Sequence, residues 1–149
     1  MSSSLYSTSE PLRTNNLIPA VFDNVNKAVL CTSIENKYGV SVVTIEHLMG
    51  ALYGEEIDNL LVEINSDEVP IMDGSAKEFI KQIRKVGIKN YDTSKKFIKV
   101  IKKLQLTKGN KSISIEPYEN DLAIDFEIVY KNQLINTQRK SISLNKDNL

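Results

Sequence analysis

The chain has 149 residues, of which 41% are hydrophobic, and its 19 lysine and arginine residues balance 19 acidic residues. A formal net charge of zero gives no long-range attraction to nucleic acids or anionic membranes, so we expect neither as a partner. No apolar run approaches the roughly 18 to 20 residues that cross a bilayer, and the single cysteine, Cys31, excludes an internal disulfide. We therefore expect a protein that stays in the cytoplasm, or at most sits on a membrane surface, and in which Cys31 is a small buried hydrophobe.

The first segment, residues 1–15, is polar and rich in serine, without periodicity, and we predict a disordered leader there. Residues 16–90 then have the pattern of a first α+β domain. Between Leu17 and Val43 the pattern favours short strands, broken by Asp23-Asn24 and by the turn Lys37-Tyr38-Gly39.

The first predicted helix begins near Thr44, whose hydroxyl can cap it, and ends at Gly54, which suits a left-handed exit. Apolar residues at helical spacing form the face that packs on a sheet: Ile45, Leu48, Met49 and Leu52. A second stripe on the helix begins with His47, and its other members are small residues: Gly50, Ala51 and Gly54. Another segment or a ligand can approach this stripe closely.

A strand over Leu60–Ile64 and a turn at Asn65-Ser66-Asp67 come next. The string Ser75-Ala76-Lys77-Glu78 is a capping box, and it opens a second helix that Gly87 ends. The apolar stripe of this helix comprises Phe79, Ile80, Ile83 and Val86. Asp73-Gly74-Ser75 can bind an anion at the helix start, but the cap already explains Ser75, so we favour a structural role.

Residues 89–95 have the composition of a linker, and beyond them the apolar period changes to two. We predict an antiparallel meander of four strands, with an amphipathic strand between Lys95 and Lys103 and a turn at Gly109-Asn110. No helix pattern follows to cover the sheet. The fold class is therefore α+β: a two-layer sheet with two helices on one face, then an incomplete second α+β domain of antiparallel strands over residues 91–149.

Glu46 and His47 stand together on the first turn of the first helix, and His47 is the one histidine of the chain. A neutral imidazole can bind a metal ion, and a neighbouring carboxylate can take a proton from metal-bound water. The two side chains lie about 100° apart around the helix axis, near enough to serve one rim. On spacing alone, such a pair is more often a solvated acid beside a capping histidine.

Three strings around this pair occur in the order found in one enzyme family: Glu46-His47-Leu48 at a helix start, Ile57-Asp58-Asn59 before a strand, and Val69-Pro70-Ile71-Met72-Asp73-Gly74-Ser75 before a second helix. The chain resembles the zinc-dependent UDP-3-O-acyl-N-acetylglucosamine deacetylases of lipid A biosynthesis, the LpxC family. The likeness is sharpest over residues 44–88 and extends less sharply over residues 17–145.

The resemblance implies that His47 is a zinc ligand and that Glu46 is the general base for attack of water on the acetamide of UDP-3-O-acyl-N-acetylglucosamine. It also implies two similar α+β layers with metal and substrate between them. The family's opening strands, its histidine and aspartate ligands on a second-domain helix, and its later oxyanion histidine have no counterpart here. Since catalytic zinc normally takes three protein ligands, we expect a partial copy that binds zinc weakly and is inactive alone.

Two classes of function remain open. The first is a hydrolytic amidase that needs a second half, supplied in cis or in trans, to complete its zinc site. The second is a non-catalytic remnant or interaction module that pairs or self-associates through its uncovered sheet. As an N-terminal portion, the chain fits a gene fragment, a split subunit or a decayed copy.

Overall fold

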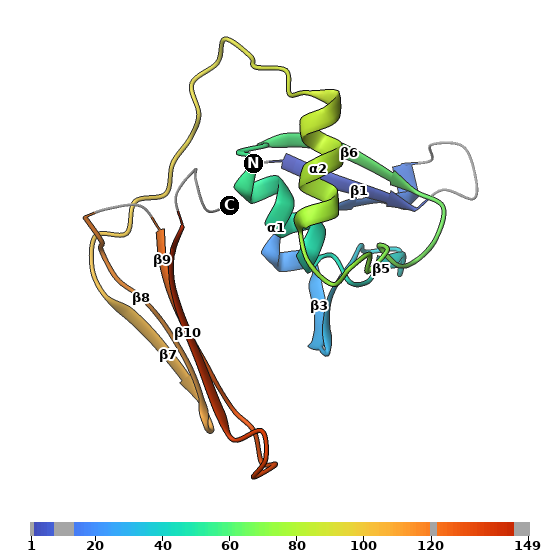
Figure 1. Ribbon diagram of the computed structural model, residues 1–149. Coiled ribbons are helices and arrows are strands. Elements are labelled where there is room, and N and C mark those ends of the chain that lie inside the picture. The colour runs from blue at the N-terminus through green and yellow to red at the C-terminus, as the bar shows by residue number, and fades with distance from the viewer. Residues whose placement is uncertain (1, 8–13, 120–121, 145–149) are drawn as a thin grey trace. The chain divides into compact units, whose positions relative to one another are not determined.

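The computed structural model describes residues 2–7, 14–119 and 122–144 (Figure 1). It divides into two compact units, Met1–Thr93 and Ser94–Leu149. Two α-helices and several mainly antiparallel sheets are present in the described residues. The α+β class expected from the sequence is confirmed.

One sheet of the first unit has the strand order β2-β1-β6. Its central strand β1 (Ser2–Ser7) pairs antiparallel with β2 (Leu17–Pro19) and parallel with β6 (Asn59–Ile64). The expectation of a disordered leader is therefore wrong for Ser2–Ser7; residues 8–13 lie outside the described part. Backbone hydrogen bonds to two neighbouring strands hold β1, and a run of serines gives no apolar alternation from which a strand could be predicted.

The other sheet of this unit has the order β3-β4-β5 and follows two short 3-10 helices, η1 (Thr14–Asn16) and η2 (Phe22–Asn24). It consists of β3 (Val25–Val29), β4 (Cys31–Glu35) and β5 (Ser41–Val42), all antiparallel. Between β4 and β5 the chain turns through Gly39, whose φ is 79°. Both predicted breaks, at Asp23-Asn24 and at Lys37-Tyr38-Gly39, are confirmed.

Asn36 ties the turn after β4 to the segment that enters β2. Its Nδ2 donates to the carbonyl oxygens of Asn15 at 2.7 Å and Leu17 at 3.0 Å. Its Oδ1 accepts hydrogen bonds from the backbone N–H groups of Tyr38 at 2.9 Å and Val40 at 3.1 Å. This buried amide therefore donates two hydrogen bonds and accepts two, which satisfies both its NH₂ group and its oxygen.

The helices α1 (Glu46–Gly54) and α2 (Lys77–Val86) lie against each other in Figure 1. A Cβ placed on Gly50 of α1 would lie 4.0 Å from the Cβ of Ala76, so the start of α2 is the segment that approaches the small stripe. Alternate residues of β6 join both helices in one core, whose buried members are Ile18, Ile34, Val42, Ile45, Leu48, Leu52 and Val69.

The ends of α1 differ from the sequence expectation. Thr44 does not cap the helix, because its hydroxyl bonds Glu68 instead. The left-handed residue after the helix is Glu56, with a φ of 55°, and Gly54 is the last helical residue. Glu56 is also held by a hydrogen bond from its N–H to the carbonyl of Tyr53 at 3.1 Å, which fixes the exit turn.

The start of α2 follows the prediction in part. The Ser75 hydroxyl accepts a hydrogen bond from the Lys77 N–H at 3.1 Å, while Glu78 lies 3.6 Å from the Lys81 ammonium. Gly87, with a φ of 87°, ends the helix as expected. Phe79 and Ile83 contact the core, but Val86 is 86% exposed and lies outside the apolar face.

The second unit contains two antiparallel hairpins. The strands β7 (Leu104–Lys108) and β8 (Lys111–Ile115) flank the predicted turn at Gly109-Asn110, and β9 (Leu122–Val129) pairs with β10 (Thr137–Leu144). The predicted strand between Lys95 and Lys103 is wrong. That stretch is irregular, and Ile98 within it is 97% exposed. An alternating pattern forms a strand only beside a partner strand, and this stretch pairs with none in the described residues.

Each hairpin has one apolar face. On the first hairpin Leu104 lies opposite Ile115, and Leu106 lies opposite Ile113. On the second, Leu122 lies opposite Leu144 and Ile124 opposite Ile142, and the apolar alternation continues along β9 through Phe126 and Ile128. These side chains are exposed, apart from Leu144, which is half-buried. The expected uncovered apolar face is therefore present in the described residues.

Candidate functional site

The candidate site lies where the chain passes from β5 into α1, a crossing of three residues from Val43 to Ile45. Val43 forms a parallel bridge with Glu68. The Val43 N–H donates to the Asp67 carbonyl at 2.9 Å, and the Val69 N–H donates to the Val43 carbonyl at 3.1 Å. The segment that follows β6 thus fixes the entry to the crossing.

Thr44, the middle residue of the crossing, has a left-handed backbone with a φ of 61°. Its side chain is buried at 5% exposure. The Thr44 Oγ1 donates a hydrogen bond to the Oε1 of Glu68 at 2.7 Å. A β-branched residue rarely adopts this conformation, so the surrounding bonds must hold it in place.

Glu46, the first residue of α1, is fixed by the strand β4. Its Oε2 accepts a hydrogen bond from the Thr32 N–H at 3.0 Å. The Thr32 carbonyl in turn accepts a hydrogen bond from the Ile45 N–H at 3.3 Å. One residue of β4 therefore holds both the backbone at the helix start and one oxygen of the carboxylate, and the Oε1 of Glu46 has no hydrogen-bond partner in the part of the chain that the structure describes.

His47 follows on the same helical turn and is half-buried. Its ring nitrogens form no hydrogen bond within the described ranges, so a lone pair is available to a ligand or metal ion. Among the residues with described positions, no three His, Cys, Asp or Glu side chains gather as a metal site. His47 fits zinc as one ligand, and the described residues do not complete a zinc site.

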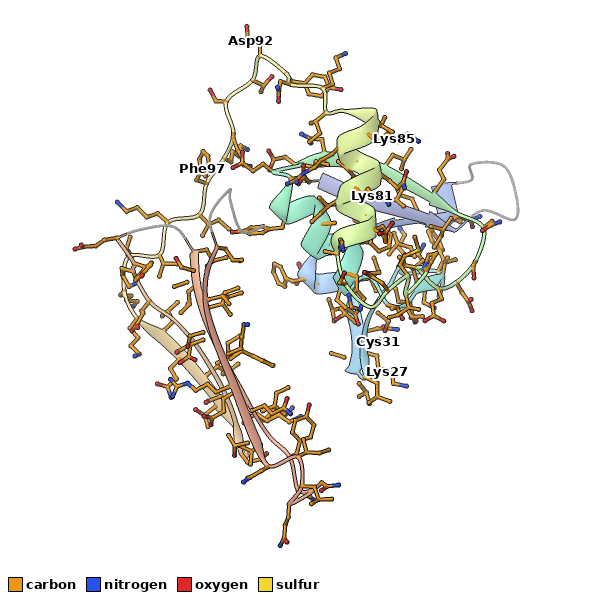
Figure 2. The ribbon with its side chains drawn as sticks, viewed as in Figure 1. Lys27, Cys31, Lys81, Lys85, Asp92 and Phe97 are labelled. Atoms are coloured by element: carbon orange, nitrogen blue, oxygen red, sulfur yellow. The ribbon has the colours of Figure 1, made fainter. Side chains whose placement is uncertain are left out.

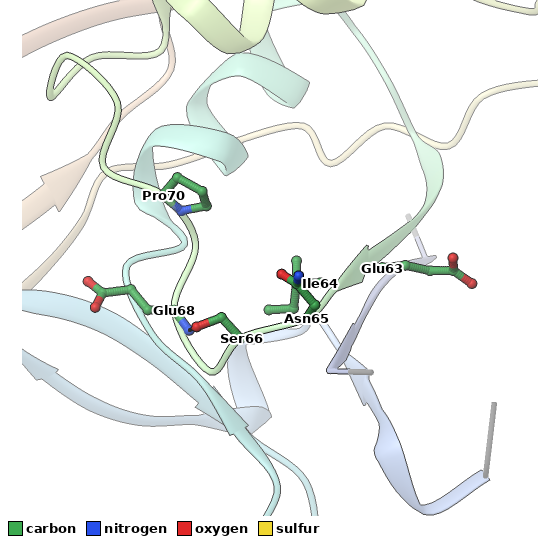
Figure 3. Close-up of a pocket in the computed structure, with 6 residues that line it drawn as sticks. All are labelled: Glu63, Ile64, Asn65, Ser66, Glu68 and Pro70. Carbon is green, nitrogen blue, oxygen red and sulfur yellow. Dashed lines mark hydrogen bonds between the residues drawn. The ribbon is translucent and has the colours of Figure 1, made fainter. Parts of the chain in front are cut away.

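A depression of about 410 Å³ lies beside this region (Figure 3) and has six lining residues: Glu63, Ile64, Asn65, Ser66, Glu68 and Pro70. In the close-up the carboxylates of Glu63 and Glu68 point away from each other. Among its lining residues, Glu68 connects the depression to the site, because it bonds Thr44. Sequence reasoning missed Glu68, since nothing local links it to a residue 24 positions earlier.

The string Asp73-Gly74-Ser75 has its polar groups bonded to one another. The Oδ1 of Asp73 accepts from the Ser75 hydroxyl at 2.8 Å and from the Ser75 N–H at 3.1 Å. These two bonds, the hydroxyl first, lower the pKa of Asp73 below its ordinary value of 3.8. The geometry agrees with the structural role favoured for this turn over anion binding.

Cys31, labelled in Figure 2, lies at the start of β4, opposite Val29 of β3. It is a free thiol and is half-buried, so it is less enclosed than the sequence suggested.

None of the described helices combines the length and the apolar character that crossing a membrane requires.

Comparison with known proteins gives one consistent result. The family model of LpxC, described as UDP-3-O-acyl N-acetylglycosamine deacetylase, matches residues 5–149. The UDP-3-O-acyl-N-acetylglucosamine deacetylase of Pseudoalteromonas atlantica is 42% identical over 130 residues, which are 87% of this chain and 42% of that protein. The resemblance read from the sequence is confirmed.

Two further relatives bear the same name. That of Pseudoalteromonas translucida is 44% identical over 120 residues, covering 80% of this chain and 39% of the relative. That of Nautilia profundicola is 41% identical over 131 residues, covering 88% and 44%. The chain thus spans about two-fifths of the length of the curated relatives that it matches.

Proposed function

This chain belongs to the UDP-3-O-acyl-N-acetylglucosamine deacetylase family, and from that premise we propose that it supplies the Glu46 and His47 part of a deacetylase site. The observation that carries the proposal is their arrangement. One oxygen of Glu46 is held by the Thr32 N–H at 3.0 Å, and the adjacent His47 ring is left without an internal hydrogen bond in the described residues.

In the proposed reaction the Oε1 of Glu46 takes a proton from a water molecule. The oxygen of that water attacks the acetamide carbonyl of UDP-3-O-acyl-N-acetylglucosamine at the same time. The C–N bond of the amide then breaks, acetate leaves, and Glu46 returns the proton to the nitrogen, which becomes the free amine of the sugar. The bond from Thr32 keeps Oε2 occupied, so Glu46 presents one defined oxygen to the water.

His47 would hold zinc as one of several ligands, with the remaining ligands supplied by residues outside the described site. When bound, zinc polarises the carbonyl and makes water more acidic. With one such ligand, we expect this chain alone to bind zinc weakly and to show no turnover. We propose lipid A biosynthesis as the pathway, because the name of the relatives identifies UDP-3-O-acyl-N-acetylglucosamine as their substrate.

A second candidate function is a non-catalytic interaction module. The observation that favours it is the exposed apolar face of each hairpin in the second unit, where Leu106 and Ile113 are 70% and 71% exposed. In this alternative the Glu46 and His47 pair is a solvated helix start, and the hairpins bind a partner. Deacetylation that depends on Glu46 would exclude it.

The test is a chimaera in which residues of this chain replace the matching 130 residues of the Pseudoalteromonas atlantica relative. We expect zinc-dependent deacetylation that Glu46→Gln lowers by roughly 10² to 10⁴ in kcat, as loss of a general base does. The glutamine oxygen can still accept the Thr32 N–H, so the fold is kept. Glu63→Gln is the matched control and should leave the rate unchanged. Full activity of Glu46→Gln would show that Glu46 is not the base.

A further inference from the structure

Glu46 and His47 directly follow the three-residue crossing, whose middle residue is Thr44. Thr44 has a φ of 61°, a region that glycine enters freely and that a β-branched residue rarely occupies. The Thr44 side chain is nevertheless 5% exposed and directed to Glu68. A residue in this state persists only where its surroundings hold it, and such residues cluster at functional sites.

We propose that Thr44 and Glu68 are a positioning pair that sets the orientation of Glu46 and His47, a role that deepens the proposed function and rests on it. The hydroxyl of Thr44 donates to the carboxylate of Glu68 at 2.7 Å. A hydrogen bond to an ionised acceptor is stronger than a neutral one. Without Glu68 the buried hydroxyl would lose this partner, which raises the free energy of the left-handed conformation.

The residues before and after Thr44 are hydrogen-bonded to two different segments, so Thr44 is the point about which one can move relative to the other. Before it, the Val43 N–H bonds the Asp67 carbonyl at 2.9 Å, and this anchor belongs to the same segment as Glu68. After it, the Ile45 N–H bonds the Thr32 carbonyl at 3.3 Å on a different strand. Rotation at Thr44 therefore shifts the start of α1 relative to the segment 67–69.

His47 is the side chain most affected by such a shift. Glu46 has its own bond to the Thr32 N–H at 3.0 Å, which retains one oxygen even when the backbone moves. The His47 ring has no hydrogen bond within the described residues, so its direction follows from the backbone of the first turn. The pair thus acts on His47 through the chain and contacts neither water nor substrate itself.

The single histidine gives a direct measurement in the whole chain. We compare Glu68→Ala, which removes the acceptor, with Glu68→Gln, whose amide oxygen keeps one, and use Glu63→Ala on β6 as the matched control. The imidazole signals of His47 are recorded by ¹H–¹⁵N NMR, first without metal and then during a Zn²⁺ titration. Glu68 is exposed, so these variants leave the apolar core intact.

We expect Glu68→Ala to move and broaden the His47 ring signals and to weaken their response to Zn²⁺ by roughly tenfold, the low end for loss of a supporting residue. Glu63→Ala should match the unsubstituted chain, and Glu68→Gln, which keeps an acceptor but a weaker neutral one, should stay much closer to it than Glu68→Ala does. Thr44→Ser, which keeps the hydroxyl, should match the unsubstituted chain too, whereas Thr44→Val should resemble Glu68→Ala.

Unchanged ring signals in folded Glu68→Ala overturn the positioning pair. Ring signals displaced in Glu68→Gln and in Glu63→Ala as far as in Glu68→Ala overturn it as well, because the effect would then come from loss of any negative charge. A failure of the proposed function is a different result: Zn²⁺ leaves the His47 signals of the unsubstituted chain unmoved, while the metal-free comparison of Glu68→Ala with Glu68→Gln still decides the positioning role.

Discussion

The guanidinium of Arg84 on α2 bonds the carboxylate of Glu55 just after α1, with an Nε to Oε1 distance of 2.9 Å and an Nη2 to Oε1 distance of 2.8 Å. The Glu55 side chain is 9% exposed, so the pair joins the end of one helix to the last turn of the other at a sheltered carboxylate. The hydrogen bond to Glu55, and then its charge, raise the pKa of Arg84.

We predict that Arg84→Ala lowers the thermal midpoint of the first unit, because Glu55 is left sheltered without its cation. Lys85→Ala removes a neighbouring charge from the same turn and is the control, with no comparable effect. Adding Glu55→Gln to Arg84→Ala should recover part of the loss. Equal midpoints for Arg84→Ala and Lys85→Ala in circular dichroism melts would contradict the prediction.

Asn36 should be among the least replaceable polar residues of the first unit. Asn36→Ala removes two donors to the Asn15 and Leu17 carbonyls and an acceptor for the Tyr38 and Val40 N–H groups. We expect a loss of roughly 2 to 3 kcal/mol in unfolding free energy, measured by urea titration. Asn36→Asp should also destabilise, since a carboxylate would face two carbonyl oxygens.

The control for this measurement is Asn24→Ala. Its amide donates one exposed hydrogen bond, to the Pro19 carbonyl at 2.7 Å, so we expect a loss below about 1 kcal/mol. A similar loss in Asn24→Ala and Asn36→Ala would mean that the buried network around Asn36 adds nothing beyond a surface bond.

Two glycines should respond to alanine with opposite signs. Gly50 lies within α1, and an added Cβ meets the Ala76 Cβ at 4.0 Å, an ordinary contact, so Gly50→Ala should raise stability by about 1 kcal/mol through helix propensity. Gly39 has a φ of 79° in open space, so Gly39→Ala should lower stability by about 1 kcal/mol through backbone strain alone. Chemical denaturation of both variants tests the pair, and a loss in Gly50→Ala would show that α2 packs more tightly there.

The second hairpin should contain a carboxyl group with an unusually acidic titration. Asp125 on β9 accepts hydrogen bonds from Arg139 at 2.9 Å and from Ser141 at 2.8 Å, both on β10. Arg139 first, and then Ser141, lower its pKa from 3.8 to about 2. Because the folded pKa is below the unfolded value, this stabilisation is complete above pH 4 and is lost as the pH falls through about 2.

Carboxyl ¹³C NMR measures this directly. We expect the Asp125 signal to titrate near pH 2 in the unsubstituted chain and to move toward its ordinary value of 3.8 in Arg139→Ala. Asp125→Asn should abolish the acid-dependent loss of hairpin signals over this interval. A midpoint near 3.8 in the unsubstituted chain would mean that the bonds between β9 and β10 do not persist in solution.

Features encoded by neighbouring residues were predictable from the sequence. Three features depend only on residues close along the chain: the end of α2 at Gly87, the turn at Gly109-Asn110, and the adjacency of Glu46 and His47. Local turn and cap chemistry is enough to predict these elements.

Features that depend on pairing between distant segments were not predictable. Ser2–Ser7 form a strand because β6 and β2 lie on either side, and the stretch between Lys95 and Lys103 alternates without a paired strand. The Glu68 carboxylate bonds the Thr44 hydroxyl across 24 positions, next to the parallel bridge between Val43 and Glu68, so the cap expected at Thr44 was replaced by a tertiary bond. The catalytic roles of Glu46 and His47 stay predictions.

The open apolar faces of the two hairpins also determine how this chain takes up heat. The positive heat-capacity change of unfolding comes from apolar surface that becomes hydrated. Every side chain of β7, β8 and β9 is already in contact with solvent, whereas the seven buried members of the core belong to the first unit. The curvature of the chain's stability with temperature is therefore set by the first unit, and any molecule that covers the hairpins would add its own calorimetric signature.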